Sequence, residues 1–497
     1  MYLELKKYDA RDDYSGIYHC EIYQREEGFS VKMGSVLRNI SYSFTANMIS
    51  LAVSVFMVMF VPKFLSVNDY GLWQLFLFYF SYLGFLHFGW EDGIYLRYAG
   101  KSFKELNPRT FAGQFYSIIL LQFVLVLVVS FFGYMFVSDP DKKLALVCAI
   151  CLAPFVNFNN LCNFIMQITN RIKEYAKLLV TERVIFFAGV LFFLVILGRN
   201  EFRYMYSAQV FAVVSMAAAG VYLCRGLLVP RFDSIASIRH EAYENISVGS
   251  KLMLANIAGM LIIGIIRYGI SIGWDVATFG KVSLTLGVSN FLMVFINSVS
   301  VVFFPIVKRM DEGKRSEVYT VIRNALTFLL FAGLIGYYPA RYILSLWLPK
   351  YADSLVYMSV LFPVCVFASK VSLLINTYLK SMRKEFLMLE INAASVGFSL
   401  VVTVITVGIW HNLNAAVFSI VLSYAFQCVL AEYQVTKLLG LDLRKNMIED
   451  LLMCGIFIIS GWVFESFLCM AVYGAAYAVF VLVHRKSLQQ IIGMVRR

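Results

Sequence analysis

An arginine stands inside one of the most apolar stretches of the chain, IIGIIRYGIS (262–271). An arginine near the centre of a bilayer costs about 3 kcal/mol on insertion scales, so a lone one usually pairs with an anion or serves a function. Lys281 and Lys370 also fall inside apolar ranges. A guanidinium fork suits phosphate oxygens, and lysine adds a mobile point charge. We interpret Arg267, Lys370 and Lys281 as candidate ligands for an anion, with snorkelling to the membrane surface as the alternative for Arg267 and Lys281.

Polar side chains recur at helical spacing in three apolar ranges, so each series lies on one face of a helix. The series are Asn39, Ser43, Asn47, Ser50 and Ser54; Asn157, Asn160, Asn163, Gln167 and Asn170, following Pro154; and Ser283, Asn290 and Asn297. Single groups of this kind often hold helices together. Long amide stripes instead favour a watery cavity that binds a hydroxyl-rich ligand. The candidate residues for binding such a ligand are Asn47, Ser50, Asn157, Asn160, Asn163, Gln167, Asn290 and Asn297.

Acidic residues inside the apolar ranges lie close to their ends, which leaves the deeper positions to basic residues. His87 and Glu91 are four residues apart and share a helix face with Asp92 beside them, and Glu182 precedes Arg183 in a later range. A histidine and a carboxylate near water can bind a coupling proton or cation, or they can form ion pairs that gate the inner end. Both readings remain open for these five residues.

The cysteines predict no chemistry of their own. Cys148 and Cys151 form a C-x-x-C pair, but on a helix this spacing places two small apolar residues on one face. We therefore expect no metal site and no cofactor.

The elements that carry these residues are membrane-spanning helices. The 497 residues are 60% hydrophobic and 15% charged, with a mean hydropathy of +0.73, which is typical of a polytopic membrane protein. About 14 helices are predicted, in an all-α fold. Their approximate ranges are 41–61, 72–94, 111–137, 144–168, 178–198, 204–224, 248–272, 280–305, 321–337, 354–379, 386–409, 413–431, 447–464 and 466–483.

The net charge of +12 follows the expected topology and excludes a nucleic-acid partner. Of 43 Lys and Arg residues, only a few lie at the predicted outer face, and most lie at the inner face, as the positive-inside rule requires. Both termini are therefore expected in the cytoplasm. The outer basic residues are Lys63, Lys142, Lys143, Arg199, Arg203, Arg341 and Lys350.

The predicted organisation is two lobes of six helices followed by two more helices. Residues 1–35 are expected to be a disordered cytoplasmic tail or to precede a start at Met33. The N-lobe is 36–224, a cytoplasmic linker is 225–247, the C-lobe is 248–433, the last two spans are 434–485 and a cytoplasmic tail is 486–497. DYGLW (69–73) and TFGKV (278–282) open the second helix of each lobe, as in a parallel internal repeat.

Several stretches resemble the polysaccharide and O-antigen flippase family, within the superfamily that includes multidrug and toxin extruders and lipid II flippases. The resemblance covers about residues 34–485, although that superfamily often has an acid near the position of Arg267. The stretches are NDYGLWQLFLFYFSYLGFLHFGWEDGIYLRYAGK (68–101), NRIKEYAKL (170–178), IRYGISIGWDVATFGKVSL (266–284), VVFFPIVKRM (301–310) and NTYLKSMRKE (376–385).

The resemblance implies a transporter that moves undecaprenyl-diphosphate-linked oligosaccharide from the inner to the outer leaflet of a bacterial inner membrane by alternating access. The basic residues would meet the diphosphate, the amides would meet the sugars, and the lipid tail would stay in the bilayer or beside the last two spans. Expected partners are the lipid-linked oligosaccharide, membrane lipids and polysaccharide polymerase machinery, with the transporter itself a monomer. The alternatives are a multidrug exporter of the same fold and, less favoured, a membrane-embedded polymerase or ligase, which should carry a large outer loop.

Overall fold

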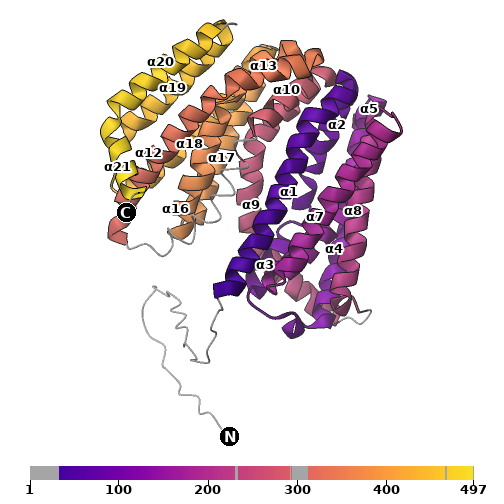
Figure 1. Cartoon of the computed structure of the whole chain (residues 1–497). Helices are drawn as coiled ribbons and strands as arrows, with labels where there is room; N and C mark the ends of the chain where they lie inside the picture. The colour runs from indigo at the N-terminus through magenta and orange to yellow at the C-terminus, as the bar shows by residue number, and fades with distance from the viewer. Residues whose placement is uncertain (1–32, 230–232, 291–292, 294–311, 465–466, 496–497) are drawn as a thin grey trace.

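The chain folds into helices that run between two faces of the molecule. The computed structural model describes residues 33–229, 233–290, 293, 312–464 and 467–495, and these residues form helices and no strand. Figure 1 shows the start of α1 (Met33–Phe64) and the whole of α21 (Arg485–Val495) at one face, here called the terminal face. The opposite face is called the distal face. Among the described residues, ten helices are long and apolar enough to cross a membrane, or up to twelve if each of two bent pairs is one span.

The first half of the chain forms the N-lobe, drawn in indigo to magenta in Figure 1. Proline at the first position begins α4 and α5, and the preceding Asn107 and Asp139 accept hydrogen bonds from backbone N–H groups of the first turn. Its helices after α1 are α2 (Val67–Phe80), the 3₁₀ turn η1 (Leu83–Phe85), α3 (Trp90–Tyr98), α4 (Pro108–Phe136), α5 (Pro140–Cys151), α6 (Ala153–Ile168), α7 (Ile172–Leu191) and α8 (Phe202–Cys224).

The second half forms the C-lobe, and two further helices pack on its side away from the N-lobe (Figure 1). Its helices are α9 (Ile235–Gly273), α10 (Val276–Ser289), α12 (Arg315–Ile335), α13 (Tyr337–Trp347), α14 (Val356–Leu361), α15 (Val364–Ser369), the π segment η7 (Lys370–Ile375), α16 (Asn376–Ser381), α17 (Glu385–Thr403) and α18 (Leu413–Leu438). The two further helices are α19 (Arg444–Val463) and α20 (Phe467–Val483).

The described helices confirm an all-α, multi-pass membrane fold, but some elements differ from the sequence-based expectation. The second span, expected as continuous over 72–94, is broken into α2, η1 and α3. Most of the expected linker, 225–247, belongs to α9, and the expected tail after residue 485 contains α21. The expected span 280–305 begins as α10, while its second half and residues 1–32 lie outside the described residues.

α9 belongs to both lobes. Near the terminal face it packs on α3, where Arg97 donates a hydrogen bond to Glu241 at 2.9 Å and also pairs with Glu244. Farther along it packs on α17, where Ser399 donates a hydrogen bond to the backbone oxygen of Ile262 at 2.6 Å. One uninterrupted helix of 39 residues therefore joins the N-lobe at one end to the C-lobe at the other.

The repeated motif brings the lobes together at the distal face. Ser66 caps α2 and Asp275 caps α10, and in each helix a glycine follows the cap by five residues. A Cβ on Gly71 would lie 2.1 Å from the backbone oxygen of Val276, and one on Gly280 would lie 2.7 Å from the Cα of Gly71. The two backbones are thus in direct contact, which only glycine permits at these two positions.

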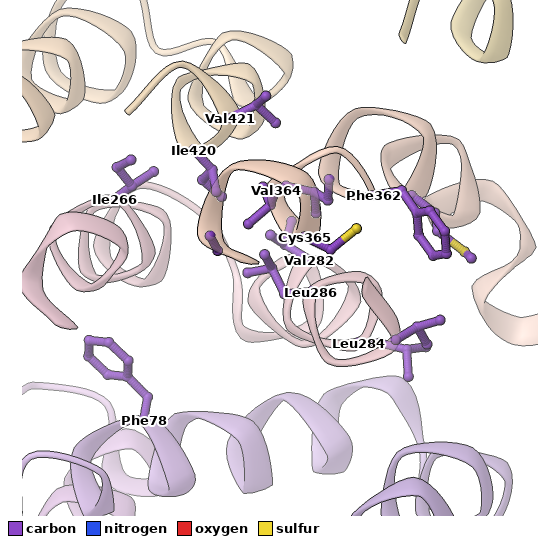
Figure 2. Packing of buried hydrophobic residues seen from close by; sticks show 14 of the residues in the cluster. Phe78, Ile266, Val282, Leu284, Leu286, Phe362, Val364, Cys365, Ile420 and Val421 are labelled. Atoms are coloured by element: carbon purple, nitrogen blue, oxygen red, sulfur yellow. The ribbon is translucent and has the colours of Figure 1, made fainter. Parts of the chain in front are cut away.

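A hydrophobic core extends across this contact. Figure 2 shows Phe78 of α2 on one side, with Ile266 of α9 and Val282 of α10 on the other. All three side chains are buried, as are Val364 of α15 and Ile420 of α18. The closed distal half of the molecule is therefore held by apolar packing between the lobes, and the polar groups described below interrupt it.

Candidate functional site

Arg267 lies at the interface between the lobes, on the part of α9 nearest the distal face. One guanidinium nitrogen donates a hydrogen bond to the Ser283 hydroxyl of α10 at 3.1 Å. The guanidinium carbon lies 5.2 Å from the ring centre of Phe78 and 5.3 Å from that of Phe279. Both distances allow a cation–π interaction, which strengthens where water is excluded. The arginine is thus held between an aromatic ring of each lobe.

The same arginine has no acidic partner among the described residues. Its Nε is buried and makes no hydrogen bond, and the neighbours that interact with it electrostatically are Tyr70, Tyr82 and Tyr424. A buried guanidinium without a carboxylate keeps a full positive charge and unused donors, which costs free energy unless an anion binds. We call Arg267, Phe78, Phe279, Ser283 and these three tyrosines the Arg267 site.

Tyr82 reaches the site because the facing helix leaves room for it. It follows α2 in the N-lobe, and a Cβ on Gly264 of α9 would lie 1.9 Å from its hydroxyl oxygen. That hydroxyl donates a weak hydrogen bond to the backbone oxygen of Met260 at 3.4 Å. The Arg267 site therefore contains groups from both lobes, so a change in their relative position must change the site.

The other two basic residues predicted to bind a diphosphate have acidic partners. Lys281 of α10 forms an ion pair with Asp353 at 2.6 Å near the distal surface. Lys370 lies 3.2 Å from Glu432 and also pairs with Asp450, and its side chain is 1% exposed. The structure does not bring either lysine together with Arg267 through any described contact. This geometry does not favour Lys370 as a ligand, because its charge is already balanced inside the C-lobe.

Lys370 belongs to a buried network of four charges that the sequence reasoning missed. Arg323 of α12 pairs with Glu432 of α18 at 2.8 Å and with Asp450 of α19, so two cations face two carboxylates. All four side chains are at most 5% exposed. Lys370 opens a π segment, an irregularity that often marks a functional or constrained position. Here the network ties α19 to the C-lobe.

The amides predicted to bind sugar are divided between α1 and the interior of the N-lobe. Asn47 is exposed and Ser50 is half-buried on α1. Asn157 is buried and donates hydrogen bonds to the backbone oxygens of Leu83 at 3.1 Å and Ala153 at 3.0 Å. Asn160 lies close to Gly84, and Asn163 is buried with an oxygen that has no partner. The amide face of α6 therefore lies against the break in the second span.

The remaining predicted residues are not gathered into this site. Gln167 is half-buried at the terminal end of α6, and Asn290 is exposed at the end of α10. Asn297 lies outside the described residues. Glu182 and Arg183 lie on α7, and no described contact joins them to His87, Glu91 or Asp92.

His87, Glu91 and Asp92 do come together, at the break between η1 and α3. The Nε2 atom of His87 lies 4.0 Å from Glu91 and 3.8 Å from Asp92, and its Nδ1 accepts a hydrogen bond from the backbone N–H of Gly89 at 3.0 Å. Glu91 is fully buried, and neither of its carboxyl oxygens makes a hydrogen bond. We call these three residues the His87 triad.

Two other side chains close the break around the triad. The broken span leaves backbone groups without helical partners, and such groups need partners inside a membrane. Asn157 of α6 donates a hydrogen bond to the backbone oxygen of Leu83, and Gln122 of α4 donates one to the backbone oxygen of Leu86 at 3.0 Å. Phe88 and Gly89 have left-handed backbone angles, with φ of 53° and 84°. The polar residues of α4 and α6 thus hold the triad's backbone in an irregular form.

Comparison with known proteins identifies the fold. No protein-family model matches the chain, and no curated protein matches its sequence. A solved structure of the lipid II flippase MurJ in an inward closed conformation covers 91% of this chain and 100% of its own, with 11% identity and a TM-score of 0.63. An inward-facing multidrug resistance MATE family transporter of the MOP superfamily covers 79% of this chain and 98% of its own, with 12% identity and a TM-score of 0.56.

A third similar structure is a MOP superfamily transporter from Pyrococcus furiosus, described as having a reverse polarity of its binding pocket that suggests a different function. It covers 81% of this chain and 96% of its own, with 12% identity and a TM-score of 0.51. These identities are low, so the likeness concerns the arrangement of helices. The chain is a multi-pass membrane protein with the fold of the MOP superfamily transporters.

Proposed function

We propose that this protein is a flippase for a lipid-linked oligosaccharide, which it carries by its diphosphate group across the bacterial inner membrane by alternating access. The observation that supports this most is the Arg267 site, a buried cation at the lobe interface with unused donors and no described acidic partner. An anion at that position would satisfy the guanidinium, and a diphosphate matches its fork. The similar MurJ structure is that of a lipid II flippase, which also carries a lipid-linked substrate.

Direction and energy are consistent with this proposal. We place the terminal face in the cytoplasm, because most of the basic residues flank the spans on that side. A diphosphate then moves outward with an inside-negative membrane potential, which contributes about 2.3 kcal/mol per charge per 100 mV. The products are oligosaccharides for surface polysaccharides such as O-antigen or capsule.

We also propose that the His87 triad binds the coupling proton rather than serving as an ion-pair gate. The basic group that the structure places nearest to Glu91 is the His87 imidazole, at 4.0 Å, and a buried carboxyl that makes no hydrogen bond favours its neutral, protonated form. The titratable groups that face it from neighbouring helices are Cys162 of α6, with Cys224 of α8 behind it. The role of inner gate falls instead to Arg97, which pairs with Glu241 and Glu244 of α9.

The strongest alternative is a multidrug exporter, because MATE transporters share the fold. Exporters of organic cations need acidic groups at the substrate, whereas the interface described here presents a cation. The acidic residues Glu432 and Asp450 are occupied by Arg323 and Lys370. The electrostatics of the interface therefore favour an anionic substrate over an organic cation.

The test is to delete the gene in its native strain and follow the lipid-linked oligosaccharide. We expect it to accumulate in the cytoplasmic leaflet while surface polysaccharide disappears. The intact gene should restore both. An Arg267→Ala copy of equal abundance should reduce flipping at least about tenfold, as expected when one charge-assisted contact worth more than 1.4 kcal/mol is lost.

Two controls sharpen this test. Arg199→Ala removes an exposed arginine from a distal loop and should leave flipping unchanged. Arg267→Lys keeps the charge without the fork and should restore only part of the activity. Normal distribution of the glycolipid with altered drug tolerance in the deletion strain would reject the flippase in favour of a drug exporter.

A further inference from the structure

A second basic site lies at the terminal face, away from the lobe interface. A hollow of about 600 Å³ opens between the terminal ends of α12, α16, α17 and α18. Arg315, Arg383 and Lys384 line it, together with the hydroxyl-bearing Ser316 and Ser381. No ion pair of Arg383 or Lys384 is found among the described residues, and both are exposed. Three cationic side chains therefore converge on one small space.

Arg383 occupies a backbone conformation that suits glycine. α16 ends at Ser381, and the N–H groups of Arg383 and Lys384 then donate to the backbone oxygens of Lys380 at 3.2 Å and Leu379 at 2.9 Å. This pair of bonds is a Schellman motif, in which the residue at the position of Arg383 is left-handed and usually glycine or asparagine. Arg383 has φ of 55°. An arginine here is strained, and such strain persists mainly where the side chain serves a function.

The N-lobe contains the same motif without the strain. α6 ends at Ile168, and Asn170 and Arg171 donate the equivalent bonds to the backbone oxygens of Gln167 at 3.1 Å and Met166 at 2.7 Å. Asn170 has φ of 57°, which asparagine tolerates well. Arg171 also has a carboxylate partner, Glu174, at 3.5 Å. The turn of the C-lobe therefore carries more positive charge and more backbone strain than the equivalent turn of the N-lobe.

The hollow is also partly apolar. Met382, Leu438 and Leu439 line it beside the basic residues, and the side chain of Leu438 is 45% exposed. The nearby acids Glu317 and Glu385 lie in the first turns of α12 and α17 but do not line the hollow. Because α17 begins at the rim, its first free N–H groups add further positive potential.

We propose that this hollow binds a phosphate-bearing anion, and that the anion is the headgroup of an acidic phospholipid of the adjacent leaflet. A basic hollow between helices at the cytoplasmic surface is the arrangement that binds such headgroups. The phosphate contacts Arg315, Arg383 and Lys384, and the acyl chains start along Met382 and Leu438. A free phosphate ion offers the same charge without the apolar portion. This site is separate from the Arg267 site and does not depend on the proposed transport function.

The experiment measures the thermal stability of the purified full chain in a neutral detergent. The probes are dihexanoyl-phosphatidylglycerol, dihexanoyl-phosphatidylcholine and inorganic phosphate, each titrated against the melting temperature. We expect the anionic lipid to stabilise the protein in a saturable manner and the other two to have much weaker effects. Equal stabilisation by both lipids would overturn the proposal. If inorganic phosphate raised the melting temperature as much as the anionic lipid does, the result would support the phosphate site and assign it to a soluble anion.

Arg383→Gly is expected to raise the stability of the protein and to lower its affinity for the lipid. Because these two effects have opposite signs, weaker binding by this variant cannot be explained by poorer folding. Glycine relieves the left-handed strain, so the melting temperature without lipid should rise by about 1–3 °C. The apparent affinity for the anionic lipid should fall about tenfold or more, since a charge-assisted contact is lost.

Two further variants complete the comparison. Asn170→Gly changes the equivalent turn of the N-lobe and should leave the lipid affinity unchanged. Lys384→Gln removes a charge without altering the strained residue and should weaken binding. Unchanged affinity in both Arg383→Gly and Lys384→Gln would reject the site.

Discussion

At the scale of single residues, the unusual feature of the His87 triad is a buried carboxyl that makes no hydrogen bond. The surface carboxylate of Glu105 is satisfied by hydrogen bonds. Its side chain accepts hydrogen bonds from the hydroxyl and the backbone N–H of Ser102, and these hold the pKa of Glu105 below its ordinary value. Glu91 accepts none, although it is fully buried. A proton is the smallest group that can remove the cost of that burial.

We expect Glu91→Gln to abolish the pH dependence of transport while leaving the protein folded. Glutamine has the shape of the protonated carboxyl, so the packing at the break is retained. Flux of lipid-linked oligosaccharide into proteoliposomes, measured between about pH 5.5 and 8, should vary in the original protein and stay flat in the variant.

The matched control is Glu105→Gln. The depressed pKa of Glu105 keeps it ionised throughout this range, because a carboxyl with a lowered pKa gains a proton only at a pH below that pKa. Its replacement should leave the pH profile unchanged. A Glu91→Gln protein with the original pH profile would exclude the triad as the coupling site.

Residue-level prediction from the sequence worked best where one side chain was unusual by itself. Arg267 interrupts an apolar run, and the structure places it at the lobe interface. Arg323 and Asp450 are also charged residues inside predicted spans, so the sequence contains the same signal for them. It was missed because both lie near the ends of those spans, where charges are tolerated. Their convergence with Lys370 and Glu432 depends on the packing of four separate helices, which no local pattern contains.

At the scale of elements, that network shows that α19 is an integral part of the C-lobe. From the sequence alone, the last two spans are expected to be an addition to two six-helix lobes. Asp450 of α19 pairs with both Arg323 and Lys370, and Tyr473 of α20 donates a hydrogen bond to the backbone oxygen of Phe331 in α12 at 3.0 Å. Both helices are therefore fixed to α12 by buried polar contacts in addition to apolar packing.

Removing one member of this network should destabilise the C-lobe strongly. Lys370→Met leaves two buried carboxylates facing a single arginine, and breaking a buried ion pair in this way costs about 3–5 kcal/mol. The double variant Lys370→Met, Asp450→Asn removes one charge of each sign and should recover much of that loss. Thermal unfolding of the parent, the two single variants and the double variant measures the coupling.

An exposed ion pair is the comparison for the buried network, because water screens the attraction between its charges. Lys281→Met and Asp353→Asn break an exposed ion pair at the distal surface and should each cost less than about 1 kcal/mol. Strictly additive losses in the buried double variant would contradict the idea of one balanced network.

The elements also show where hydropathy reaches its limit. Long apolar runs located most helices, and the close pair α19 and α20 begins and ends near the predicted positions. The break between α2 and α3 was not predicted, because residues 75–86 are nearly all apolar or aromatic and Gln122 and Asn157 stabilise the break from other helices. The sequence predicts a linker where α9 begins with polar residues. This stretch is helical because its charged face pairs with Arg97 of α3.

At the scale of the whole molecule, the lobes are in contact at the distal face. Trp347 of α13 donates a hydrogen bond to the backbone oxygen of Met59 in α1 at 2.9 Å, and Lys63 lies over the same indole ring at 3.3 Å. The crossing of Gly71 and Gly280 lies at the same face. Toward the terminal face, the side-chain bonds between lobes that the described residues form all involve α9 or the segment just before it. Such an arrangement is closed on the distal side.

Opening the distal side should therefore follow from a single added methyl group. Gly71→Ala places a Cβ within 2.1 Å of the Val276 oxygen, so α2 and α10 must separate. In a variant whose nine cysteines are replaced, Ser283→Cys should then react faster with a membrane-impermeant maleimide added from the distal side. Flux should fall, because the distal side can no longer close.

Gly397→Ala is the control, since a Cβ at this position of α17 meets nothing within 4 Å. It should change neither labelling nor flux. Equal labelling rates in Gly71→Ala and the parent would show that the glycine crossing does not close the distal side.

α9 also has a mechanical consequence. A helix of 39 residues is about 58 Å long, and it is clamped to a different body at each end. If the two lobes rotate as rigid units, α9 must either bend or lose its contacts with one of them. Sharp kinks arise at proline or glycine, and α9 has no proline; a Cβ on its Gly259 would lie 3.6 Å from the side-chain amide of Asn392. The stiffness of the helix at that residue would then set how fast the molecule changes state.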